Sequence, residues 1–128
     1  MTVKKMVEYW IKSAEEDIKT AESLFSTKRY LPCLFYCHLF VEKVVKAIIV
    51  GKTGKSAPFG HKLSYLAKLA GLDFTKEQVR LLDDLTSFNI RARYEDYKFA
   101  IYKKAKKEYT EKYLHRTKEL YVWLKERI

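Results

Sequence analysis

Cysteine, proline and glycine are scarce in this sequence: its 128 residues include two cysteines, two prolines and four glycines. Two cysteines are too few for the disulfide framework of small secreted domains. Cys33 and Cys37 lie four residues apart in an apolar run, and two ligands on one helical face do not complete a zinc site. We therefore interpret both as small buried hydrophobic residues, in a domain that needs no metal and no cofactor.

Histidine and catalytic motifs are scarce as well. The three histidines, His38, His61 and His115, show no metal-ligand spacing, and no Gly-x-Ser-x-Gly, His-Glu-x-x-His or Cys-x-x-Cys motif occurs. Residues 51–56, Gly-Lys-Thr-Gly-Lys-Ser, look like a phosphate-binding loop, but that motif requires glycine where Ile49 stands. The sequence therefore contains no positive signal for hydrolase or redox chemistry.

The chain has no long uncharged apolar run. Its most hydrophobic stretch, residues 30–50, is interrupted by Pro32, His38, Glu42, Lys43 and Lys46. A charge at the centre of a bilayer costs about 2.5–3.5 kcal/mol on insertion scales, so the stretch predicts a buried central helix. With no secretion signal in the first ten residues, we expect a cytoplasmic protein that does not contact the membrane.

What the sequence does contain is helical periodicity. Apolar residues make up 48% of the chain and aromatic residues 15%, enough for the core of one domain over residues 1–128. The expected helices span residues 2–26, 30–50, 61–70, 75–88 and 104–127. We therefore predict an all-α fold, an antiparallel helical bundle of about five helices with an up-and-down core and a short third helix.

The punctuation between these helices is specific. Residues 51–60 hold three of the four glycines and predict the main, mobile loop, whereas residues 89–103 show no clean helical period. His61 follows the loop, which suggests a capping or loop-pinning role. Gly71 is placed to end the third helix, and Thr75-x-x-Gln78 is a capping-box start for the fourth.

Basic residues outnumber acidic ones by 26 to 16, a formal charge of +10. Such an excess favours acidic partners, either nucleic acid or an acidic protein face. Much of it lies toward the C-terminus, at Lys98, Lys103, Lys104, Lys106, Lys107 and Lys112. The alternative interpretation is a solvated helix face.

The most chemically loaded segment is Asn89–Tyr97. Its candidate ligand- or RNA-binding residues are Arg91, Arg93, Tyr94, Asp96 and Tyr97. Arginine forks suit phosphate or carboxylate, and tyrosine rings can stack on bases. The same composition suits a structural knot in which Asp96 clamps Arg93 or Arg91.

A polar stripe on the second expected helix supports this segment. His38, Glu42 and Lys46 follow one another at a spacing of four, so they share one helical face. A buried charge requires a partner, and Glu42 is a candidate to pair with a nearby arginine.

Four features, in order, resemble the HEPN family. They are Trp10-x3-Ala14-x2-Asp17-Ile18, a cysteine- and aromatic-rich helix from Tyr30 ending Val41-Glu42-Lys43-Val44-Val45-Lys46-Ala47, His61-Lys62-Leu63, and Asn89-x3-Arg93-Tyr94-x-Asp96. The resemblance implies an antiparallel helical bundle, usually a homodimer, with a minimal nucleotidyltransferase as partner. Some members are ribonuclease toxins that the nucleotidyltransferase neutralises, sometimes by adding AMP to a tyrosine. Here Tyr94 or Tyr97 would accept it.

Ribonucleases of that family use an arginine followed four to six residues later by a histidine. Arginine can stabilise phosphate charge, and histidine can move protons near neutral pH. No histidine stands in that window after Arg80, Arg91 or Arg93, and the next histidine is His115. The family's ribonuclease motif is therefore not present.

The carry-over is limited to Arg93, Tyr94 and Asp96, with Glu95 where the family often has proline. We expect a non-catalytic or weakly active HEPN module that dimerises and pairs with a minimal nucleotidyltransferase in a toxin–antitoxin-like system. The alternative is an RNA-binding protein or ribonuclease toxin that uses the basic Arg91 and Arg93 cluster, and a bound nucleotide is a further possibility.

Overall fold

The computed structural model describes residues 1–93 and 101–128. Within them the chain is helical and contains no strand, which confirms the all-α prediction. The helices are α1 (Val3–Ser26), α2 (Tyr30–Thr53), α3 (Leu63–Ala70), α4 (Lys76–Arg91) and α6 (Lys107–Lys125). Residues 101–104, just before α6, are helical as well.

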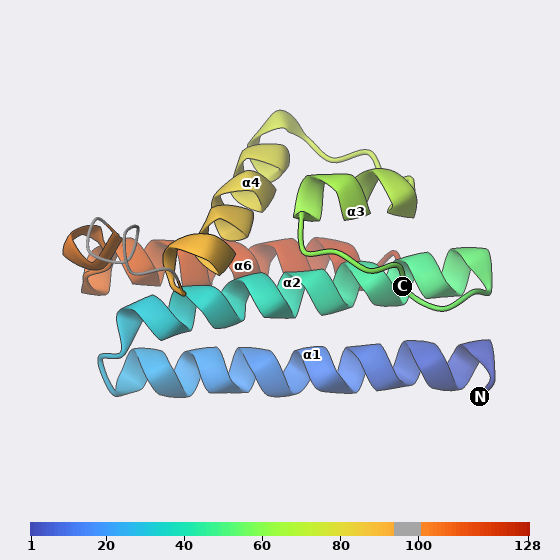
Figure 1. Ribbon diagram of the computed structural model, residues 1–128, viewed down its shortest axis with the longest axis horizontal. Coiled ribbons are helices and arrows are strands. Elements are labelled where there is room, and N and C mark those ends of the chain that lie inside the picture. The colour runs from blue at the N-terminus through green and yellow to red at the C-terminus, as the bar shows by residue number, and fades with distance from the viewer. Residues whose placement is uncertain (94–100) are drawn as a thin grey trace.

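The first two helices form a long antiparallel pair (Figure 1). Thr2 caps α1 by accepting a hydrogen bond from the Lys5 backbone N–H at 3.2 Å. Between the helices, the Lys43 ammonium lies 2.8 Å from an Asp17 carboxylate oxygen and donates to the Ser13 hydroxyl at 2.7 Å. These polar contacts fix the rotation of α1 on α2, because Asp17 is largely buried.

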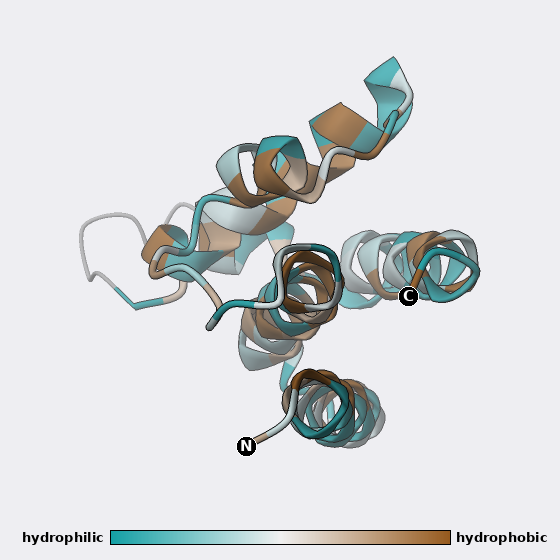
Figure 2. Ribbon diagram, turned by 90° about the vertical axis from the view of Figure 1, so that its right-hand side faces the viewer, coloured by the Kyte–Doolittle hydropathy of each residue, from teal (hydrophilic) through white to brown (hydrophobic). Residues whose placement is uncertain are grey.

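Helix α2 is the centre of the bundle. It lies between α1 on one side and the α3 and α4 pair on the other, with α6 alongside (Figure 2). Buried apolar side chains occupy nearly every face of α2, and this explains why its sequence shows no clean amphipathic stripe. Within the part of the chain described, no helix is long and apolar enough to cross a membrane.

Two helix ends differ from the sequence prediction. Helix α2 continues to Thr53, so residues 51–53 are helical rather than part of the loop, and Gly54 ends the helix with a left-handed φ of 69°. Helix α4 continues to Arg91 rather than ending near Phe88. The loop is therefore shorter than predicted, and Arg91 lies on a helix.

The remaining predictions of local structure are mostly confirmed. Gly71 follows α3 with a φ of 66°, and Thr75 and Gln78 form the reciprocal capping box that starts α4. Helix α3 begins at Leu63 and α6 at Lys107, both slightly later than predicted. The expected bundle with a short third helix is therefore correct in its architecture.

Candidate functional site

Arg93 lies where the C-terminal end of α4 approaches the first turns of α2. Its guanidinium carbon is 6.0 Å from the centre of the Phe35 ring, and its Nε donates a hydrogen bond of 2.8 Å to the Asn89 carbonyl. The side chain is exposed but oriented by these contacts. The ring and the carbonyl together fix the direction of the guanidinium group, which is planar and permanently charged.

A groove of about 550 Å³ opens beside Arg93. It is lined by Lys28, Arg29, Tyr30, Leu31, Pro32, Phe35, Tyr36, Ala92, Arg93, Tyr102 and Ala105. Three of these residues are basic, four are aromatic, and no carboxylate occurs among the described lining residues. The groove is therefore suited to a ligand that carries both negative charge and flat rings.

Exposed lysines flank part of the groove lining in sequence. Lys103, Lys104, Lys106 and Lys107 are all exposed, and they flank Tyr102 and Ala105 of the groove lining in sequence. Clustered cations raise the local concentration of an anionic ligand and speed its encounter. Part of the basic C-terminal segment noted in the sequence therefore flanks the groove lining along the chain.

The structure separates the two arginines that the sequence grouped together. Arg91 is the last residue of α4 and lies over Phe88, with its guanidinium carbon 6.0 Å from the ring centre, and it does not line the groove. Tyr94, Asp96 and Tyr97 lie outside the described residues. Of the predicted site residues in the described region, only Arg93 lies in the groove.

The polar stripe on α2 forms a buried cluster. The Glu42 Oε2 atom accepts a hydrogen bond from the Lys46 ammonium at 3.1 Å, and Glu42 Oε1 lies 2.9 Å from His61 Nδ1. The prediction that Glu42 pairs with an arginine is wrong, because Lys46 lies on the next helical turn and the loop brings His61 over the carboxylate. Lys46 also lies 5.5 Å from the centre of the Trp10 ring, which extends the cluster to α1.

His38 completes the cluster. Its Nε2 lies 2.8 Å from the His61 carbonyl, which can only accept, so this nitrogen carries the proton and donates. The ring is fully buried, and Nδ1 has no hydrogen-bond partner among the described residues. Burial lowers the pKa of His38 from its ordinary value, with the His61 carbonyl and Glu42 acting in the opposite direction. A neutral His38 therefore holds the end of the loop, so His61 has the loop-pinning role expected from its position.

The two cysteines are buried and unpaired. A hydrogen bond with Cys33 and burial both raise the pKa of the Cys37 thiol well above its ordinary value. No group of histidine, cysteine or acidic side chains in residues 1–93 and 101–128 could hold a metal ion. Both cysteines are thus buried core residues, in agreement with their interpretation from sequence as small buried hydrophobic residues.

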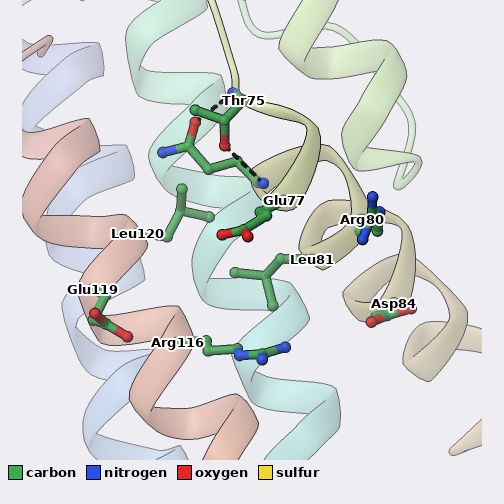
Figure 3. Close-up of a pocket in the computed structure, with 9 residues that line it drawn as sticks. Thr75, Glu77, Arg80, Leu81, Asp84, Arg116, Glu119 and Leu120 are labelled. Carbon is green, nitrogen blue, oxygen red and sulfur yellow. Dashed lines mark hydrogen bonds between the residues drawn. The ribbon is translucent and has the colours of Figure 1, made fainter.

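A second cleft, of about 470 Å³, lies between α4 and α6 (Figure 3). Its walls carry Glu77, Arg80 and Asp84 from α4 and Arg116 and Glu119 from α6. Charges of both signs occur here, whereas the charged residues among the described lining of the groove at Arg93 are all basic. The Tyr113 hydroxyl donates to Asp84 at 2.9 Å, and burial together with this carboxylate raises the pKa of Tyr113.

Most of the groove was not predicted from sequence. The missed residues are Lys28, Arg29, Tyr30, Phe35, Tyr36 and Tyr102. One signal was available, since Lys28-Arg29-Tyr30 places two cations and a ring directly before a helix that continues with Phe35 and Tyr36. What could not be read was that this turn meets the end of α4.

The molecule is thus an all-helical bundle that presents a basic, aromatic groove at one end. The chain belongs to the HEPN family, because the model of the HEPN domain matches residues 7–128, nearly the whole chain. The chain is also similar to TT1696 from Thermus thermophilus, known from a crystal structure, with a TM-score of 0.80 and 18% sequence identity. That match covers 95% of this chain and 98% of the other, and at this identity it establishes the fold alone. A search of curated proteins found no match.

Proposed function

We propose that this protein is a non-catalytic HEPN module that binds single-stranded RNA in the groove at Arg93. The observation that carries the proposal is a groove with three cations, four aromatic rings and no carboxylate among its described lining residues. Membership of the HEPN family supports a module linked to nucleotides or RNA. The volume of the groove, about 550 Å³, falls in the range of small-molecule pockets and accommodates a nucleotide unit.

Each group in the groove has a role in this proposal. Arg93, Lys28 and Arg29 supply the positive charge that attracts the phosphate backbone. Tyr36 and Tyr102 offer ring faces on which bases stack without regard to sequence. The result is electrostatic binding with little base specificity.

Binding rather than cleavage follows from the positions of the histidines. His38 is fully buried, and His61 is engaged by Glu42 outside the groove lining. His115 is exposed on α6, where it pairs with Glu119 at 3.3 Å. No histidine among the described residues stands in the groove as a proton-transfer group beside Arg93.

The test compares Arg93→Ala with Arg91→Ala, a matched control that removes the same charge two residues away. Fluorescence anisotropy with a labelled oligouridylate should show weaker binding for Arg93→Ala, by about tenfold or more. Its slope of log affinity against log salt should fall by about 0.7, the value of one phosphate contact on a single strand. Equal affinity and slope for Arg93→Ala and the wild type would reject the groove as the binding site.

We also propose that the protein forms a homodimer and pairs with a minimal nucleotidyltransferase in a toxin–antitoxin-like system. Family membership supports this pairing. Co-expression with a minimal nucleotidyltransferase, followed by size exclusion with light scattering, should give a complex of defined stoichiometry. A monomer that does not associate with that protein at micromolar concentration would reject both parts of the proposal.

In such a pair, Tyr94 or Tyr97 is the proposed acceptor of AMP, and both lie outside the described residues. The partner, ATP and this chain are incubated together, and the intact mass is measured. One added AMP, lost in the Tyr94→Phe/Tyr97→Phe variant, would support the assignment, whereas an unchanged wild-type mass counts against it.

A further inference from the structure

A long stretch of the chain contains no acidic residue. Between Glu42 and Asp73 the sequence has no aspartate or glutamate, and it contains Lys43, Lys46, Lys52, Lys55, Lys62 and Lys68. Three of these lysines have internal partners: Lys43 binds Asp17, Lys46 binds Glu42, and Lys52 donates to the Ala70 carbonyl.

The other three lysines point into solvent. Lys55, Lys62 and Lys68 are exposed, and none of their ammonium groups forms a hydrogen bond or ion pair with any described residue. They lie in the loop after α2, immediately before α3, and on α3 itself. Their charges are therefore available to an external anion, with no carboxylate from this stretch to neutralise them.

Exposed apolar side chains alternate with these lysines along the sequence. The Phe59 side chain is 97% exposed, Tyr65 is 52% exposed, and Leu69 is 42% exposed. A phenylalanine left almost entirely in water gains nothing for folding, and such residues in one region mark an interaction site. We call the surface formed by Lys55, Phe59, Lys62, Tyr65 and Lys68 the Phe59–Tyr65 surface.

The backbone of the Phe59–Tyr65 surface is held in place at several points. Gly54 starts the loop with a left-handed φ of 69°, and the His61 carbonyl accepts the hydrogen bond from buried His38. The His61 ring contacts Glu42, and the Leu63 N–H donates to the Thr86 hydroxyl of α4 at 3.0 Å. The buried cluster of His38, Glu42 and Lys46 therefore holds the backbone of the Phe59–Tyr65 surface in place.

We propose that the Phe59–Tyr65 surface is a second contact for the same single-stranded RNA strand, an inference that rests on RNA binding at Arg93. Lysine ammonium groups neutralise phosphates, and Phe59 and Tyr65 stack on bases. An acidic protein partner fits less well, because lysines separate the apolar residues. The buried centre of a protein interface is depleted in lysine.

The two contacts lie on one side of the bundle. Arg93 packs on Phe35 of α2 and His61 on Glu42 of the same helix, seven residues further on, which is roughly 10 Å along the axis. Helix α4 and the loop before α3 both lie on the side of α2 away from α1 (Figure 1). A strand that leaves the groove at Arg93 therefore needs only a few nucleotides to reach the loop.

The experiment measures binding of labelled oligouridylates of about 4 and about 12 nucleotides, the range of site sizes of single-strand binding folds. The test variants are Lys55→Gln/Lys62→Gln/Lys68→Gln and Phe59→Ala. The matched control is Lys4→Gln/Lys5→Gln/Lys12→Gln, which removes the same charge from exposed lysines of α1.

For the longer oligonucleotide, the test triple variant should reduce the salt slope by about 2, the value of three phosphate contacts on a single strand. Phe59→Ala should weaken its binding about 5- to 150-fold, as expected for one lost stacking contact. The shorter oligonucleotide, which cannot fill the groove and all contacts of this surface together, should lose less affinity in these variants than the longer one.

Equal affinities and slopes for the test and control triple variants would overturn the proposal, while a loss in Arg93→Ala would leave the groove assignment intact. If instead the test triple variant loses affinity while Arg93→Ala binds like the wild type, the surface is retained and the groove is rejected. If the test triple variant keeps its RNA affinity but no longer binds the nucleotidyltransferase partner, the surface belongs to an acidic protein and the RNA assignment is overturned.

Discussion

The His61 Nδ1 atom lies 2.9 Å from the Glu42 carboxylate, although 19 residues separate them in the chain. Glu42 is almost completely buried and also receives Lys46, whereas the His61 ring is 62% exposed. The contact thus joins the interior of α2 to the loop that carries Phe59. Stability of the core and order of the loop should depend on the same carboxylate.

Glu42→Ala should destabilise the protein by about 3–5 kcal/mol, because it leaves Lys46 buried without its partner charge. Urea denaturation measures the change. Glu16→Ala is the control, since Glu16 pairs with Lys19 on the surface and should change stability by less than about 1 kcal/mol. Similar losses for the two variants would show that the buried pair has no special energetic role.

Stability should fall as the pH is lowered, because burial depresses the pKa of His38 in the folded state. The unfolded chain takes up this proton below about pH 6.5, whereas the folded chain resists it. The stabilisation is therefore full above that pH and is lost as the pH falls toward the depressed value. Melting temperatures between about pH 7.5 and pH 5 should decline less steeply in His38→Gln than in the wild type, and parallel curves would exclude His38 as the source.

Lys52→Met should loosen α3 while leaving α2 intact. The Lys52 ammonium donates to the Ala70 carbonyl at 2.6 Å, and that carbonyl belongs to the last residue of α3. A cation at this end also interacts favourably with the helix dipole, so the loss should be about 1 kcal/mol. Amide hydrogen exchange should accelerate in residues 63–70 before it changes in α2, and uniform acceleration would contradict a local role.

Tyr102→Ala should weaken RNA binding without destabilising the fold. Tyr102 lines the groove, yet it is 66% exposed and contributes little to the core. Loss of one stacked base should cost about 1–3 kcal/mol of binding free energy. Tyr9→Ala, at a similarly exposed tyrosine of α1, is the control for anisotropy titrations, and equal affinities in the two variants would remove Tyr102 from the proposed site.

The fold could be predicted from sequence because each helix carries its own local signals. Thr75 and Gln78 start α4, Gly71 ends α3, and apolar spacing defines α1. The end of α2 was mispredicted because Gly51 normally weakens a helix. In the structure Gly51 faces Val7 of α1, and a Cβ at this position would lie 3.7 Å from the Val7 side chain, so tertiary contact extends the helix past the glycine.

The candidate site could be predicted only in part. Arg93 could be singled out because it lies in a segment, Asn89–Tyr97, whose basic and aromatic composition is evident from the sequence. Arg91, two residues earlier, lies over Phe88 outside the groove. Composition alone did not separate the two arginines, although the family pattern matched only Arg93. Glu42 was predicted to pair with an arginine, but in the structure its carboxylate contacts Lys46 and His61.

Sequence by itself determined the helical class, the HEPN resemblance, the basic charge and the lack of the ribonuclease motif. These properties depend on residue identity and short-range spacing. Tertiary structure decided that Lys28, Arg29 and Arg93 line the same groove, and that His61 contacts Glu42. Such contacts depend on how α4 and the loop pack on α2, and packing is set by the fit of whole helices rather than by any local pattern.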